Sequence, residues 1–182
     1  MSLDGFIAGP NITPDLPMGE NGLKLHKWLF DGKTDIDSQV INETVSTSGA
    51  VITGWGTYNI AIDHAWNGTS PFDVPAFVLS HHVPKKLIKG FSFVTNGMNS
   101  AVEQAKAAAG DKNVWVMGGA NVIQQFLKAR LFDELQLHMV PLLLSNGTRL
   151  FEAHGNQLEL EKIKTIDTAT ATHFKFRKQN SV

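Results

Sequence analysis

The stretch that decides the fold is residues 114–127, which read Val-Trp-Val-Met-Gly-Gly-Ala-Asn-Val-Ile-Gln-Gln-Phe-Leu. The apolar run 113–117 predicts a buried strand, and residues 120–128 predict a helix that starts directly after Gly118 and Gly119. Free backbone N–H groups at a helix start, together with the helix dipole, can bind a phosphate or diphosphate. Glycine lets such a ligand approach the backbone closely. The other interpretation is a tight strand-to-helix turn without a ligand.

A second stretch has the same pattern. Residues 51–58 read Val-Ile-Thr-Gly-Trp-Gly-Thr-Tyr, again a short apolar strand that runs into glycines and a helix. The carboxyl ends of parallel strands in one sheet face the same crevice, where open α/β sheets bind their ligands. The turns at Gly54 and Gly118 therefore predict one shared ligand-binding edge.

Strand and helix candidates alternate along most of the chain. Strands are expected at 2–8, 50–53, 75–80, 91–95, 113–117 and 134–144, and helices at 23–30, 36–47, 57–62, 99–109 and 120–128. Two runs with period-two alternation, 158–166 and 170–176, predict a C-terminal β-hairpin with Asp167 near its turn. This order favours a mostly parallel sheet with helices on both faces. No linker or repeat divides the chain, so we expect a single domain over residues 1–182.

The composition excludes several classes of protein. Lys plus Arg is 16 and Asp plus Glu is 17, so the net charge of −1 argues against nucleic acid or an anionic membrane as the main partner. There is no cysteine, which removes disulfides and thiolate metal sites. No apolar run approaches the length of a membrane span, and no basic flank marks the N-terminus as a signal peptide. We expect a cytoplasmic protein.

Other catalytic motifs fail on their spacing. Asp31-Gly32-Lys33-Thr34 ends like a P-loop, but Lys27 stands where that motif needs glycine. No Gly-x-Ser-x-Gly turn is present to expose a nucleophile. No metal is expected, because the histidines lack metal-type spacing: His26, His64, His81, His82, His138, His154 and His173.

Taken together, these stretches resemble the dihydrofolate-reductase-like superfamily, in the branch that includes the reductase domain of riboflavin biosynthesis. The resemblance covers nearly the whole chain. It is carried by residues 2–8, 51–58 and 116–120, and by the later segments 133–135 and 141–143. It implies a three-layer α/β/α fold with a mostly parallel central sheet and a C-terminal antiparallel hairpin.

The resemblance also implies a cofactor, NADPH or alternatively NADH, across the carboxyl ends of the strands. It assigns cofactor binding to Ile7, Ala8, Gly54, Trp55, Gly56, Thr57, Ser80, His81, Thr95, Gly118, Gly119, Ala120, Asn121 and Val122. The substrate is expected near Asn11, His26 and Phe30. Hydride transfer needs mainly placement of the two reactants. Asp4 is the first candidate for a proton donor, and capping of a turn is the other role open to it.

Four departures from the family pattern limit the expected activity. Trp55 stands where relatives often carry the Arg or Lys that pairs with the 2′-phosphate of NADPH, which leaves the choice of cofactor open. The predicted helix 23–30 lacks the acidic residue with which dihydrofolate reductases bind the pterin. Phe6 replaces a basic residue of the riboflavin-pathway reductases, and Met1 falls where relatives have further strand residues, which predicts a short or truncated N-terminus.

The expected function is hydride transfer from NAD(P)H to a small pterin-, pyrimidine- or carbonyl-type substrate other than dihydrofolate. Two alternatives stay open: a catalytically silent dinucleotide-binding module on the same fold, and an unrelated mononucleotide-binding domain. A homodimer is expected because the long strands from Glu134 onward would leave an exposed sheet edge.

Overall fold

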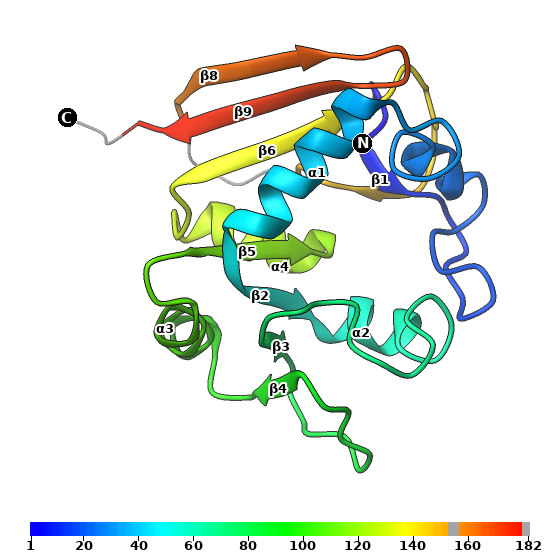
Figure 1. Ribbon diagram of the computed structural model, residues 1–182. Coiled ribbons are helices and arrows are strands. Elements are labelled where there is room, and N and C mark those ends of the chain that lie inside the picture. The colour runs from blue at the N-terminus through cyan, green and yellow to red at the C-terminus, as the bar shows by residue number, and fades with distance from the viewer. Residues whose placement is uncertain (153–156, 180–182) are drawn as a thin grey trace. The chain divides into compact units, whose positions relative to one another are not determined.

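A computed structural model describes residues 1–152 and 157–179 of the chain (Figure 1). The chain forms two compact units, each assembled from segments that are far apart in the sequence. Unit 1 contains residues 1–12, 18–41 and 124–182, and unit 2 contains residues 13–17 and 42–123. Each unit is described by itself below.

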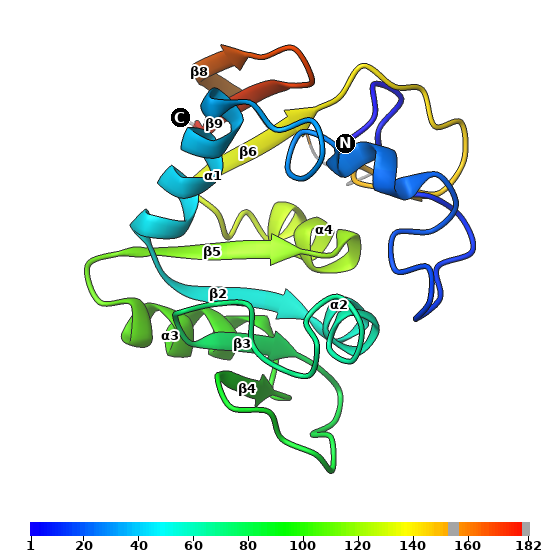
Figure 2. The same ribbon diagram turned by 45° about the vertical axis from the view of Figure 1, so that its right-hand side comes forward.

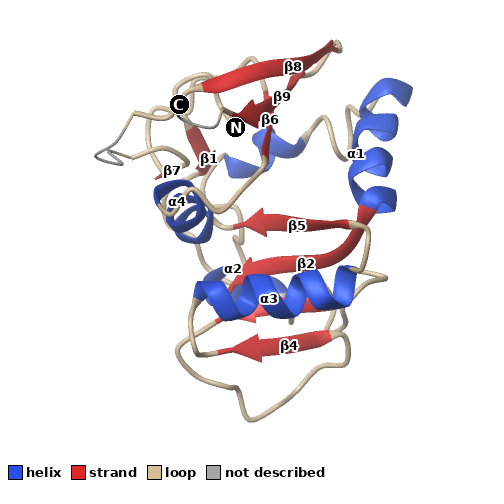
Figure 3. Cartoon of the chain, turned by 90° about the vertical axis from the view of Figure 1, so that its left-hand side faces the viewer, coloured by secondary structure: helices blue, strands red, loops and turns tan. Residues whose placement is uncertain are grey.

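Unit 2 is built on a four-stranded parallel sheet with the order β4-β3-β2-β5. Its strands are β2 (Ser48–Gly54), β3 (Ala76–Leu79), β4 (Phe91–Val94) and β5 (Asn113–Gly118). Helix α3 (Met98–Ala109) covers one face of this sheet (Figure 3). The buried side of α3 carries alanines at helical spacing, Ala101, Ala105 and Ala109, which let the helix lie close to the strands.

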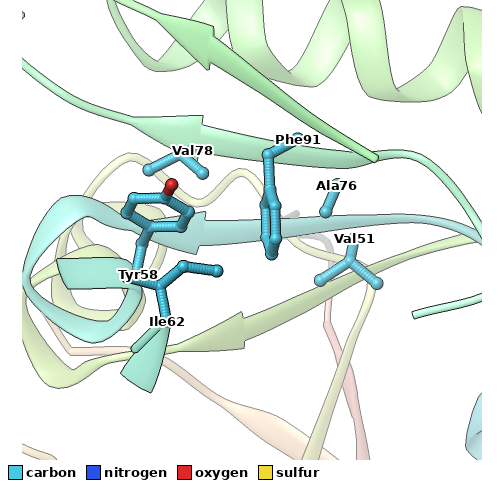
Figure 4. Packing of buried hydrophobic residues seen from close by; sticks show 6 residues of the cluster. All are labelled: Val51, Tyr58, Ile62, Ala76, Val78 and Phe91. Atoms are coloured by element: carbon cyan, nitrogen blue, oxygen red, sulfur yellow. The ribbon is translucent and has the colours of Figure 1, made fainter. Parts of the chain in front are cut away.

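The other face of the sheet carries an aromatic core (Figure 4). Tyr58, from helix α2 (Trp55–Ala61), packs between the strands and the ring of Phe91, at a ring-centroid distance of 5.0 Å. Trp66 stacks on Phe91 at a ring-centroid distance of 5.6 Å. Buried aromatic pairs of this kind add stabilisation beyond the area that they bury.

Unit 1 contains antiparallel strands. Strands β6 (Glu134–Met139), β8 (Leu160–Asp167) and β9 (Thr172–Lys178) form a sheet with the order β6-β9-β8, so the predicted C-terminal hairpin is confirmed. Strand β1 (Phe6–Ala8) pairs with β7 (Thr148–Arg149) in a separate two-stranded sheet. A 3-10 helix, η1 (Gly22–His26), and the first part of α1 (Asp35–Thr47) complete the unit.

The predicted order of elements is confirmed, with local differences that have physical causes. The strand expected over 2–8 begins only at Phe6, because residues 2–5 form a turn in which Gly5 has a φ of +92°. The strand expected over 134–144 ends at Met139, shortly before Pro141, which cannot donate a ladder hydrogen bond. The predicted helix 23–30 is the short η1, and β7 was not predicted. No helix of the described residues is long and apolar enough to cross a membrane.

Candidate functional site

The two glycine turns lie at the ends of neighbouring strands in unit 2. β2 and β5 run parallel and side by side, and each leads into a helix: α2 after β2, and α4 (Ala120–Lys128) after β5 (Figure 2). The register pairs Thr53 with Gly118. The Thr53 hydroxyl donates a hydrogen bond of 2.9 Å to the Gly118 carbonyl oxygen, which fixes one turn to the other.

Close packing between the turns explains two of the glycines. A Cβ atom on Gly54 would lie 2.7 Å from Cγ2 of Val122, and one on Gly119 would lie 2.9 Å from Oγ1 of Thr57. Gly118 has a φ of +131°, a region that other residues rarely adopt. Each turn therefore needs glycine because of its partner turn, without any ligand.

Gly56 has no such structural reason. It is exposed in the first turn of α2, and a Cβ atom there would meet nothing within 4 Å. A Cβ atom on Gly118 would likewise meet nothing within 4 Å. The first turns of α2 and α4 present backbone N–H groups that have no acceptor within their helices. The space and the donors fit a diphosphate at this edge of the sheet.

Trp55, the first residue of α2, contacts the loop that follows β3. Its ring meets the ring of His82 edge-on at 4.3 Å and lies 6.2 Å from that of Phe93. The Ser80 hydroxyl holds this loop, because it accepts the N–H of His82 at 3.1 Å and donates to the His82 carbonyl oxygen at 2.7 Å.

Three more of the cofactor candidates lie along the same edge. Ser80 and His81 follow β3, and Thr95 follows β4, so they share the carboxyl edge of the sheet with Gly54 and Gly118. His81 and Thr95 are exposed. The structure thus brings the predicted cofactor residues of unit 2 to one sheet edge.

The other two cofactor candidates, Ile7 and Ala8, belong to β1 in unit 1. Ala8 is buried and pairs with Thr148 on β7. The backbone of Gly147 packs tightly against the carbonyl group of Ala8. A Cβ atom at position 147 would collide with that carbonyl group, so no side chain fits there. β1 also lies against η1, which carries one of the substrate candidates.

The substrate candidates form two local pairs in unit 1. The Asn11 amide donates to the Glu20 carboxylate at 2.8 Å. The His26 and Phe30 rings stack with centroids 6.3 Å apart, and 62% of Phe30 is exposed. Nδ1 of His26 is buried without a hydrogen-bond partner, and burial lowers the pKa of this imidazole.

Asp4 has the turn-capping role that the sequence left open. Its carboxylate oxygens accept the backbone N–H groups of Leu144 at 3.0 Å and of Ser145 at 2.7 Å. A hydrogen bond from the Ser2 side chain, followed by these backbone donors, lowers the pKa of Asp4 to about 2. The carboxyl group is therefore ionised at neutral pH and holds no proton to donate.

Sequence reasoning missed a buried polar network in unit 1. Asp37, in the first turn of α1, is fully buried and hydrogen-bonded to His173 on β9, which contacts His138 on β6. Thr34, three residues before Asp37, is the one local signal, since this spacing is typical of a helix start. The two histidines pair only through the register of β6 and β9 and leave no sequence motif.

Metal ligands are absent from the described part of the chain. Within residues 1–152 and 157–179, no three His, Asp or Glu side chains group closely enough to hold a metal ion. His154 lies outside the described residues.

Two relatives from Bacillus subtilis (strain 168) match almost the whole chain. The uncharacterized protein YwjB is 27% identical over 181 residues, which cover 96% of this chain and 92% of YwjB. The uncharacterized protein YyaP is 30% identical over 175 residues, which cover 91% of this chain and 84% of YyaP.

Solved structures match over a similar extent. A protein from Shewanella sp. PV-4 named for riboflavin biosynthesis aligns with a TM-score of 0.75 and 22% identity, over 98% of this chain and 95% of that one. The Thermotoga maritima diaminohydroxyphosphoribosylaminopyrimidine deaminase/5-amino-6-(5-phosphoribosylamino)uracil reductase aligns with a TM-score of 0.64 and 14% identity, over 98% of this chain and 54% of that one. These likenesses show the dihydrofolate-reductase-like fold. The model of the RibD C-terminal domain matches residues 1–172, and the chain therefore belongs to the RibD C-terminal domain family.

Proposed function

We propose that this protein is an NAD(P)H-dependent reductase that acts on a small heterocyclic or carbonyl substrate. The observation that carries the proposal is the pair of glycine turns at the ends of β2 and β5, with open space beside Gly56 and Gly118. Membership of the RibD C-terminal domain family supports the proposal, as does the name of the Thermotoga maritima neighbour, which includes 5-amino-6-(5-phosphoribosylamino)uracil reductase.

In this proposal the cofactor diphosphate binds the two turns. The residues 118–122 supply donors from one turn, and Gly54, Gly56 and Thr57 supply the other side. The adenosine end lies toward Trp55, Ser80, His81 and Thr95. NADPH is the expected cofactor, and NADH is the alternative because Trp55 offers no cation to a 2′-phosphate. When bound, the cofactor supplies the hydride.

Unit 1 supplies the substrate residues. Ile7 and Ala8 are proposed to approach the nicotinamide, and Asn11, His26 and Phe30 the substrate. The exposed ring of Phe30 offers a stacking surface to a planar heterocycle, and the unpaired Nδ1 of His26 offers it a polar partner. Pterin-, pyrimidine- and carbonyl-type compounds are the substrate classes to test.

The test is a titration of the purified protein with NADPH and NADH, followed by quenching of tryptophan fluorescence. The variant to compare is Gly56→Leu, because its side chain enters open space and leaves the fold intact. We expect its Kd for NADPH to rise at least about tenfold, which is about 1.4 kcal/mol of binding free energy. Asn59→Leu, on the exposed side of the same helix, is the matched control. Wild-type affinity in Gly56→Leu would place the phosphate site elsewhere.

One observation favours a second candidate, a dinucleotide-binding module without catalysis. Both carboxylate oxygens of Asp4, the candidate proton donor, accept backbone N–H groups of the turn at residues 144–145. Oxidation of NADPH in the presence of a broad panel of heterocycles and carbonyl compounds separates the two candidates. Saturable binding without turnover of any compound would favour the silent module.

We also propose a homodimer, to be tested by the mass of the protein in solution. The strand β8 is an edge of the antiparallel sheet and carries Glu161, Lys162 and Lys164, charged side chains that oppose direct strand pairing. The dimer is therefore expected to form through packed side chains rather than through a continued sheet. A monomeric mass at micromolar concentration would end this proposal.

A further inference from the structure

A chain of three ionisable side chains crosses the interior of unit 1. Asp37 is 0% exposed and His173 is 4% exposed. Nε2 of His173 lies 2.8 Å from Oδ1 of Asp37, and Nδ1 of His173 lies 2.8 Å from Nδ1 of His138. The three side chains come from α1, β9 and β6, and they are hydrogen-bonded in the order Asp37, His173, His138.

The partners of Asp37 fix one end of this chain. Oδ2 accepts the backbone N–H of Thr34 at 2.7 Å and its hydroxyl at 2.6 Å. Burial alone would raise the pKa of Asp37, but the hydrogen bonds from Thr34 and His173 outweigh it and lower this pKa to about 2. The carboxylate is therefore ionised and only accepts, so Nε2 of His173 carries a proton and donates it to Oδ1.

The contact between the two Nδ1 atoms holds a single proton. A hydrogen bond between two ring nitrogens needs one donor and one acceptor, so one of the two histidines carries the proton and the other offers its lone pair. If the proton is on His173, that ring is a cation beside the Asp37 carboxylate. If it is on His138, both rings are neutral. The first arrangement also has a proton on Nε2 of His138, which the second lacks, so they are related by loss of that proton and movement of the bridging proton along the 2.8 Å hydrogen bond.

His138, at the other end of these three side chains, is half-buried. Nε2 of His138 has no hydrogen-bond partner among the described residues. Among these residues it does not belong to the buried polar atoms that lack a partner, so it keeps some exposure to solvent. The His138 ring packs against the ring of Trp28, with centroids 4.4 Å apart. Trp28 lies between His26 and Phe30 in the sequence, the two residues assigned to the substrate.

The charges around His138 disfavour a cation on this ring. Burial is the main cause that lowers its pKa, to about 4, and His173 and the Met1 amino group add to this, whereas Asp37 opposes it. The Met1 amino group donates to the backbone carbonyl of His138 itself. A positive charge is better placed on His173, in contact with Asp37.

We propose that Asp37, His173 and His138 form a proton relay, and that Nε2 of His138 is the end that gives its proton to the substrate. This inference rests on the proposed reductase function. Addition of hydride to the carbon of a C=N or C=O bond leaves the heteroatom in need of a proton. Nε2 of His138 gives its proton to the substrate. The bridging proton moves from Nδ1 of His173 to Nδ1 of His138, so His138 ends as a neutral ring with its proton on Nδ1 and a lone pair on Nε2. His173 ends neutral, still donating to Asp37, and a proton from water reloads the relay.

The test follows the ring nitrogens of ¹⁵N-histidine-labelled protein by NMR as the pH is lowered from 8 to 4. A relay predicts a through-hydrogen-bond coupling between the two Nδ1 atoms, with the bridging proton on His173 and the Nε2–H on His138. In Asp37→Asn, which still accepts the hydrogen bond but carries no charge, we expect the bridging proton to shift toward Nδ1 of His138, because the charge that favours a proton on His173 is gone. His64→Gln, an exposed histidine of unit 2, is the matched control and leaves these signals unchanged.

A coupling-free spectrum would mean that the two Nδ1 atoms share no proton, and a bridging proton that stays on His138 would leave His173 with none to pass on; either result overturns the relay. These outcomes do not depend on Asp37→Asn being folded. Turnover provides the second readout: with any panel compound that is reduced, His138→Gln is expected to lower kcat at least about tenfold at an unchanged Kd for NADPH. Loss of NADPH binding in the wild type would contradict the reductase, whereas intact binding and unchanged kcat in His138→Gln would contradict the relay alone.

Discussion

The two units of this protein place their chemistry on different kinds of atoms. In unit 2 the candidate cofactor site is made mainly of backbone, at two glycine turns that end neighbouring parallel strands. In unit 1 the notable groups are the buried side chains of Asp37 and His173 and the half-buried His138, which come from three separate elements. A backbone site leaves a local sequence signal, and a side-chain network assembled from distant residues leaves almost none.

The stabilising interactions of the units differ in the same way. The core of unit 2 consists of aromatic and aliphatic side chains around Tyr58 and Phe91. Unit 1 has a smaller apolar cluster around Leu25 and Trp28, and Trp28 packs directly on the buried histidines. We therefore expect unit 2 to respond to loss of volume and unit 1 to respond to loss of charge.

The largest effect is expected from Phe91→Ala in unit 2. Phe91 contacts the rings of Tyr58, Trp66 and Phe72, so its removal leaves a cavity in the aromatic core. The free energy of unfolding is expected to fall by about 3–5 kcal/mol, measured by urea denaturation. The control is Phe30→Ala, at a ring that is 62% exposed, where a change within about 0.5 kcal/mol is expected. Equal losses in the two variants would contradict the assignment of the core.

Asp37→Ala tests the expectation that unit 1 responds to loss of charge. The substitution leaves the N–H of Thr34 and Nε2 of His173 without an acceptor in the interior. We expect the free energy of unfolding to fall by about 2–4 kcal/mol, more than in Asp37→Asn, which keeps an acceptor. Asp35→Ala, at an exposed carboxylate of the same helix turn, controls for helix effects. A loss in Asp35→Ala as large as in Asp37→Ala would assign the effect to the helix rather than to the network.

The pH dependence of stability tests the same network without a mutation. The pKa of His138 is lowered from its ordinary value of 6.5 to about 4, so the unfolded chain takes up this proton at a higher pH than the folded protein. Stability is fully present above pH 6.5, and about 1–3 kcal/mol is lost as the pH falls to 4. Asp37, with its pKa lowered to about 2, adds a further loss below about pH 3.8. Thermal unfolding from pH 8 to 3 measures both losses, and a His138→Gln variant with the same slope between pH 6.5 and 4 would refute the assignment to His138.

The sequence predicts the parallel part of the fold well, because glycines and apolar runs fix each element locally. The turns at Gly54 and Gly118 were predicted and lie on adjacent strands. The β1–β7 pairing could not be predicted, since β7 is only two residues long and its partner is about 140 residues away. The role of Asp4 was left open for the same reason: the backbone groups that it caps lie at residues 144 and 145.

The choice between NADPH and NADH is the smallest expected effect. The Trp55 ring packs on His82 and Phe93. In the proposed complex this side chain offers no cation to the 2′-phosphate of NADPH. Trp55→Arg is expected to shift the ratio of the two dissociation constants toward NADPH by about tenfold, as one charge-assisted hydrogen bond would. Trp55→Leu removes the ring without adding a charge and is expected to leave the ratio unchanged. A similar shift in both variants would mean that the ring itself, and not the missing charge, sets the preference.

A crystal structure of the protein with NADPH tests the central claim most directly. The account predicts the diphosphate against residues 54–57 and 118–122, with the open space beside Gly56 and Gly118 filled by the ligand. A dinucleotide bound away from these turns, or crystals that stay free of NADPH at saturating concentration, would contradict it.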